Sequence, residues 1–111
     1  MSARPAHETS FDALVAAFVQ QAKRLPQVRE ILVERVEDAD RIWTVIDAEP
    51  FDRSARAPVY AVELAALDAA GTPDVAFRLV NRREYAQCDL GGIVPTDAAV
   101  VWSRERVADR A

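Results

Sequence analysis

Acidic residues surround a short apolar run in the stretch VEDADRIWTVIDAE, residues 36–49. Asp38 and Asp40 are two residues apart, and Asp47 and Glu49 repeat that spacing after the run. Carboxylates that converge at the end of a strand can bind a divalent metal for nucleotidyl or phosphoryl transfer. Such an enzyme would use Asp38, Asp40 and Asp47 with Mg²⁺. The same residues also fit a hairpin turn at the first pair and a solvated strand end at the second, and this interpretation is favoured.

Four arginines could complete a different kind of site. Arg53 and Arg56 precede an expected helix, whose N-terminus favours anions, and Arg82 and Arg83 follow a later strand. If the two segments meet, these arginines would bind a small anion such as phosphate, or an acidic partner surface. The favoured alternative is a surface ion network in which the arginines balance nearby acids, namely Asp47, Glu49, Asp52 and Glu84.

Other catalytic chemistry has little support in the sequence. The single histidine, His7, lies in the expected leader, which removes the usual general base and any histidine-containing triad. The single cysteine, Cys88, has no Cys-x-x-Cys partner and is expected to be a half-buried structural residue. Gly91 and Gly92 lack the Lys-Ser/Thr that follows a phosphate-binding loop. The sequence therefore does not favour an enzyme.

The elements that position these residues begin with a helix. Residues 1–8 are expected to form a flexible leader, and Thr9 or Ser10 can cap a helix over 10–25. Apolar residues recur along it at helical spacing, and Pro26 ends it. Tyr60, Leu64 and Leu67 are expected to form the buried seam of a second helix over 58–70, after a polar loop.

Three strands are expected around these helices, and a fourth segment is ambiguous. The first strand begins at residue 28 and turns at 37–40 into a second over 41–48, which is apolar on both faces and so belongs in the middle of a sheet. A third strand over 75–81 completes a strand–helix–strand crossover. Residues 98–104 favour a last strand over a helix, and 82–95 a loop.

This order predicts an α+β fold with a mixed three- or four-stranded sheet and two helices packed mainly on one face. The single domain would cover residues 9–102, with 103–111 as a solvated tail. Trp102 lies beside two valines near its end. It would be either an exposed interface anchor or a residue that closes the open end of the core.

The order helix, strand, strand, helix, strand resembles the minimal nucleotidyltransferases of the polymerase-β-like superfamily, including the toxin–antitoxin type. The resemblance covers residues 11–102, with 28–33 as the first strand and Asp38-Ala39-Asp40 before the second. Glu34 and Arg35 stand where the family has a Gly-Ser turn, and the strand over 75–80 carries no third carboxylate. The resemblance implies a degenerate relative that keeps the scaffold without the catalytic motifs.

The composition of the chain limits the kinds of partner and compartment that we expect. The chain has 111 residues and a net charge of −4, which does not favour nucleic acid or anionic membranes as partners. A single cysteine and the lack of a long apolar run predict a cytoplasmic protein. The basic residues are almost all arginine, with Lys23 the single lysine, and alanine is abundant, which suggests a GC-rich bacterial genome. We therefore expect a non-catalytic domain without a cofactor that acts through protein–protein contacts. It would be homo-oligomeric or bound to another protein, with a regulatory or antitoxin-like role.

Overall fold

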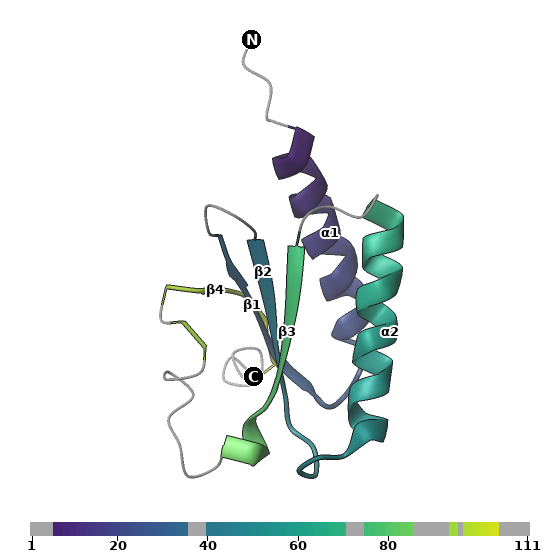
Figure 1. Ribbon diagram of the computed structural model, residues 1–111, viewed down its shortest axis with the longest axis vertical. Helices are drawn as coiled ribbons and strands as arrows, with labels where there is room; N and C mark the ends of the chain where they lie inside the picture. Colours follow the sequence, from purple (N-terminus) through teal and green to yellow (C-terminus); the bar gives the residue numbers. More distant parts are fainter. Residues whose placement is uncertain (1–5, 36–39, 71–74, 86–93, 96, 105–111) are drawn as a thin grey trace.

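The computed structural model describes residues 6–35, 40–70, 75–85, 94–95 and 97–104. In chain order the elements are α1 (Ala6–Ala22), β1 (Val28–Glu34), β2 (Asp40–Ile46), α2 (Arg53–Ala70), β3 (Val75–Asn81), the short 3-10 helix η1 (Arg82–Tyr85) and β4 (Ala99–Ser103). The strands form one mixed sheet in the order β3-β2-β1-β4. Figure 1 shows α1 and α2 side by side on one face of this sheet. The predicted α+β class, with both helices on one face, is confirmed.

Helix α1 begins earlier than predicted. It starts at Ala6, so residues 6–8 are helical and the prediction of a leader there is wrong; residues 1–5 lie outside the described part of the chain. The helix ends at Ala22, because the following residues tighten into turns in which Leu25 N–H donates to Ala22 O and Val28 N–H to Leu25 O. The predicted apolar stripe is buried against the sheet.

The antiparallel strand pair that the hairpin interpretation of the first acidic pair requires is confirmed. β1 and β2 run antiparallel, with Val33 opposite Ile42 and Glu34 opposite Arg41. Asp40 is the first residue of β2, and Asp38 lies outside the described residues. β2 is an interior strand and packs apolar residues on both faces, as its sequence predicted.

Helix α2 is longer than predicted. It begins at Arg53, so the expected loop over Arg53–Ala57 is wrong. Asp52 explains the early start, because its carboxylate accepts hydrogen bonds from the Ser54 N–H (2.9 Å) and hydroxyl (2.6 Å) and so caps the helix. Pro58 then falls in the second turn, where it removes one backbone hydrogen bond.

The buried face of α2 also differs from the prediction. Tyr60 and Leu64 are 46% and 68% exposed, whereas Val59, Glu63 and Ala66 are buried. Apolar residues occur on both sides of this helix, and Glu63 takes a core-facing position that periodicity assigns to solvent. Packing of α2 against α1 and the sheet therefore selects a different face.

The last two strands form as predicted, and the domain continues past residue 102. β3 has the predicted bounds and pairs in parallel with β2, which confirms the crossover. β4 confirms the favoured last strand and pairs with β1. Ser103 is buried in β4, and Arg104 donates to Val28 O, Lys23 O and Leu25 O. Residues 103 and 104 are therefore part of the domain and not a solvated tail.

The core has two parts, one on each face of the sheet. The larger cluster lies under the helices and includes Phe11, Phe18, Ile31 and Ile42. On the opposite face, a smaller cluster gathers Leu32, Val45, Val80 and Val94. Neither helix in the described residues is long and apolar enough to cross a membrane.

Candidate functional site

The second acidic pair lies at the end of the sheet, where the chain leaves β2 and β3. Arg82 donates to Asp47 Oδ2 from Nε (3.1 Å) and Nη2 (2.8 Å). Arg83 also donates to Asp47, and its Nη1 lies 3.2 Å from Glu49 Oε1. Because β2 and β3 are parallel, their carboxyl ends meet at one edge and bring these groups together. We call Asp47, Glu49, Asn81, Arg82 and Arg83 the strand-end network.

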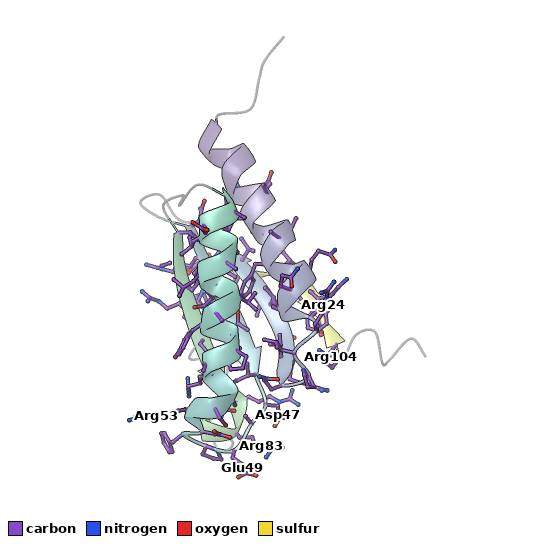
Figure 2. The ribbon with its side chains drawn as sticks, turned by 90° about the vertical axis from the view of Figure 1, so that its right-hand side faces the viewer. Arg24, Asp47, Glu49, Arg53, Arg83 and Arg104 are labelled. Carbon is purple, nitrogen blue, oxygen red and sulfur yellow. The ribbon has the colours of Figure 1, made fainter. Side chains whose placement is uncertain are left out.

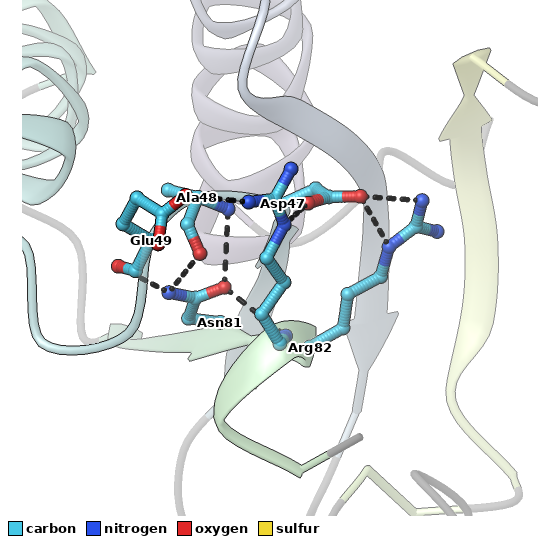
Figure 3. Close-up of polar contacts among 6 residues, drawn as sticks. Asp47, Ala48, Glu49, Asn81 and Arg82 are labelled. Atoms are coloured by element: carbon cyan, nitrogen blue, oxygen red, sulfur yellow. Dashed lines mark hydrogen bonds and ion pairs between the residues drawn. The ribbon is translucent and has the colours of Figure 1, made fainter.

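Asn81 organises this network from beneath (Figure 3). Its side-chain oxygen accepts hydrogen bonds from the N–H groups of Ala48 and Arg83, both at 3.2 Å. Its amide nitrogen donates to Ala48 O (3.0 Å) and Glu49 O (3.3 Å). Only 1% of Asn81 is exposed, so these bonds replace water for the backbone of the segment after β2. Sequence reasoning missed Asn81, because nothing local shows that an asparagine at a strand end is buried.

The charges in the network stabilise one another. The hydrogen bond from Arg82 lowers the pKa of the Asp47 carboxyl below its usual value, with a further contribution from Arg83. This arrangement is the favoured ion network, in which Arg82 and Arg83 are engaged by carboxylates. Glu49 belongs to it only at the rim, since 79% of its side chain is exposed.

The carboxylates predicted for a metal-dependent enzyme do not converge. Asp40 is the first residue of β2 and Asp47 follows its last, so about 23 Å of strand separates them at the usual rise per residue. The two cannot bind one metal ion or ion pair, and Asp38 lies outside the described residues. Over the part of the chain that the structure describes, no group of three His, Cys, Asp or Glu side chains could hold a metal ion.

Glu34 and Arg35, the two residues predicted to replace a Gly-Ser turn, make structural contacts. Glu34 Oε1 accepts hydrogen bonds from Arg41 Nη1 (3.1 Å) and Trp43 Nε1 (3.3 Å) across the hairpin. Arg35 pairs with Asp12 on α1 at 2.7 Å, and its guanidinium lies 4.8 Å from the centroid of the Phe11 ring. The Glu34 contacts join β1 to β2, and the Arg35 contacts join α1 to the end of β1.

A second cluster begins next to the network, at the N-terminus of α2. Glu84 of η1 accepts hydrogen bonds at 2.7 Å from Arg56 Nη2 and from the Phe51 N–H. The bond from Arg56 lowers the pKa of Glu84, and the bond with Glu84 raises the pKa of Arg56, to which Tyr60 adds. Phe51 adopts a φ of 61°, which is unusual for a bulky residue, and 81% of it is exposed. Glu84 therefore holds an exposed aromatic residue in a strained backbone conformation.

Beside Phe51 lies a surface hollow of about 740 Å³. It is lined by Phe51, Arg53, Arg56, Ala57, Tyr60 and Glu84. Figure 2 shows that Arg53 points away from Asp47, Glu49 and Arg83. The four predicted arginines therefore do not form one anion site: Arg56, Arg82 and Arg83 pair with carboxylates, and Arg53 faces solvent on another side.

Large apolar groups are exposed along the same side of α2. Phe51, Leu64 and Tyr60 are 81%, 68% and 46% exposed. Sequence reasoning missed this surface because it assigned Tyr60 and Leu64 to the core. The signal was present in the abundance of apolar residues on α2, which is more than one buried face needs.

Trp102, the predicted interface anchor, is half-buried and packs against the larger core cluster. The Arg104 guanidinium lies 4.9 Å from the centroid of one of its rings. This position matches the alternative in which Trp102 closes the open end of the core.

Comparison of the chain with protein-family models, curated proteins and solved structures found no match. The resemblance to minimal nucleotidyltransferases therefore stays a prediction from the order of elements.

Proposed function

We propose that this protein is a non-catalytic domain that acts through protein–protein contacts, with a regulatory or antitoxin-like role in the cytoplasm. Its contact surface is the outer side of α2 together with Phe51. The observation that carries the proposal is the exposure of Phe51, Tyr60 and Leu64 along one side of the molecule. Large apolar groups that gather on a surface are typical of interaction sites, and aromatic residues often contribute most to binding.

The backbone of Phe51 supports this choice of surface. A non-glycine residue with positive φ costs free energy, and such strain persists where the surroundings impose it, often at functional sites. Here the Glu84 carboxylate, itself paired with Arg56, holds the Phe51 N–H. The ring is thus presented to solvent with less freedom than a loop residue normally has, which lowers the entropy lost on binding.

Site-specific photo-crosslinking in the native cells tests the proposal. A benzophenone side chain at position 60 should give a protein adduct of defined mass. Leu64→Asp in the same chain should reduce the adduct at least several-fold, because it places a charge within an apolar contact. The matched control carries the benzophenone at position 78, since Arg78 is exposed on β3, away from this surface. Equal labelling at positions 60 and 78, or no adduct at either, would contradict the proposal.

A further inference from the structure

Six exposed residues form a continuous stripe on the outer side of α2, namely Arg53, Ala57, Tyr60, Ala61, Leu64 and Asp68. At about 100° per residue they fall within an arc of roughly 100° on the helix surface. Figure 2 views the molecule from this side, with α2 in front of the sheet and α1 beside it. We call these six residues the outer stripe.

The charges of the outer stripe lie at its two ends and have opposite signs. Arg53 is the first residue of α2 and Asp68 is in its last turn, about 22 Å away along the axis. Each lies at the unfavourable end of the helix dipole, since a cation is disfavoured at the N-terminus and an anion at the C-terminus. Within the described residues neither side chain has an ion-pair partner to offset this.

The apolar residues between these charges alternate in size about one midpoint. The midpoint of Arg53 and Asp68 falls between Tyr60 and Ala61. If a second α2 lay antiparallel across this point, Tyr60 would face Ala61 and Leu64 would face Ala57, so each large side chain would meet a small one. Arg53 would meet the Asp68 of the other copy, near the favourable C-terminal end of that helix.

We propose that the outer stripe is covered by a second copy of this chain, with the two α2 helices packed antiparallel about a twofold axis. A twofold interface requires one surface to be complementary to itself, and the outer stripe meets this condition in both charge and size. The inference rests on the proposed function and identifies the partner of the same surface.

Charge reversal tests the pairing directly. Arg53→Asp alone and Asp68→Arg alone each place like charges together twice in the dimer, so each should weaken self-association at least about tenfold. In an equimolar mixture, Asp at position 53 of one chain faces Arg at 68 of the other, and Asp68 of the first faces Arg53 of the second. Native mass spectrometry should then show mainly the mixed dimer, and sedimentation equilibrium should show restored affinity.

The same variants also allow a control for correct folding. Both single substitutions improve the match to the helix dipole, so each variant should keep the circular dichroism of the wild type and, at concentrations low enough for the wild type to be monomeric, melt no lower than it does. Arg78→Asp on β3 is the matched control, and this variant should dimerise with the same affinity as the wild type. A wild-type chain that stays monomeric at high concentration overturns the inference, as does a dimer that is insensitive to either reversal or a mixture that does not re-associate. If the wild type is monomeric but position 60 still crosslinks to a different protein, the proposed function stands and only the identity of the partner is wrong.

Discussion

At the scale of single residues, Asn81 is the main link between the ends of β2 and β3. One buried amide satisfies the N–H and C=O of Ala48, the C=O of Glu49 and the N–H of Arg83. Without it, these backbone groups would need other partners in a region with little access to water. A short polar side chain that is this deeply buried has a structural role comparable to that of a core hydrophobic residue.

Asn81→Ala is therefore expected to destabilise the fold by about 2 to 3 kcal/mol, because it leaves several buried polar groups unpaired. Urea unfolding followed by circular dichroism measures this change. Arg78→Ala, three residues earlier on the exposed side of β3, is the control and should change stability by less than about 0.5 kcal/mol. A similar small change for both variants would show that Asn81 is not the organising residue.

At the scale of elements, the strand-end network connects the segment after β2 to η1. Gln27 extends the connection: its backbone C=O accepts from the Asp47 N–H at 2.8 Å, and its side chain donates to Ala55 O at 3.1 Å. Elements far apart in sequence are thus joined at one edge of the sheet, below the N-terminus of α2. The Phe51 N–H donates to Glu84 of η1 at this edge, so the position of Phe51 depends on contacts between these elements.

Asp47→Asn should lower the free energy of unfolding by about 1 kcal/mol at neutral pH. The loss is modest because the ion pairs with Arg82 and Arg83 are partly exposed to solvent. The folded protein lowers the pKa of Asp47, so its stabilisation is present above the unfolded pKa and is lost as pH falls through the folded pKa. The difference between wild type and variant should therefore shrink below about pH 4. Denaturant unfolding at pH 7 and pH 3 checks this.

Glu49→Gln provides the comparison for Asp47, because its carboxylate is largely exposed. It should cost less than about 0.5 kcal/mol at either pH. A larger loss for Glu49→Gln than for Asp47→Asn would place the main connection at the rim instead.

At the scale of the whole molecule, the larger core contains polar groups that hydrophobic packing alone would not place there. Glu63 and Thr44 are 8% and 0% exposed, and their Glu63 Oε2 and Thr44 Oγ1 atoms have no hydrogen-bond partner among the described residues. Burial raises the pKa of the Glu63 carboxyl from 4.5 to about 7. The acid is therefore neutral in the fold at mildly acidic pH.

This raised pKa makes unfolding depend on pH in a defined direction. Between about pH 4.5 and 7 the unfolded chain releases a proton that the folded chain keeps, so stability should fall as pH rises and then level off. Glu63→Gln removes this ionisation. The difference in free energy of unfolding between the variant and the wild type should therefore change with pH. From pH 4 to pH 8 it should shift by about 2 to 3 kcal/mol in favour of the variant.

Urea unfolding of both proteins from pH 4 to pH 8 measures this difference. The other carboxylates are the same in both proteins, so their pH-dependent contributions to stability cancel in the comparison. Parallel curves would show that Glu63 titrates normally.

The sequence by itself determined the order of elements, the hairpin, the crossover and the exact span of β3, because alternating apolar residues and turn residues act locally. Hydrophobic periodicity also placed α1 against the sheet. The predicted start of α2 was wrong, because the cap at Asp52 and the first turn at Arg53–Ala57 are stabilised by contacts that local propensity does not contain.

Only the tertiary structure decided which groups meet. Parallel pairing of β2 and β3 brings Asp47 to Arg82 and Arg83, while the length of β2 keeps Asp40 away from them. Packing of α2 against α1 chose Val59 and Ala66 for the core and left Tyr60 and Leu64 outside, although all four are apolar. Residue types set what each side chain can do, but burial and proximity depend on contacts between distant segments, which no single stretch of sequence encodes.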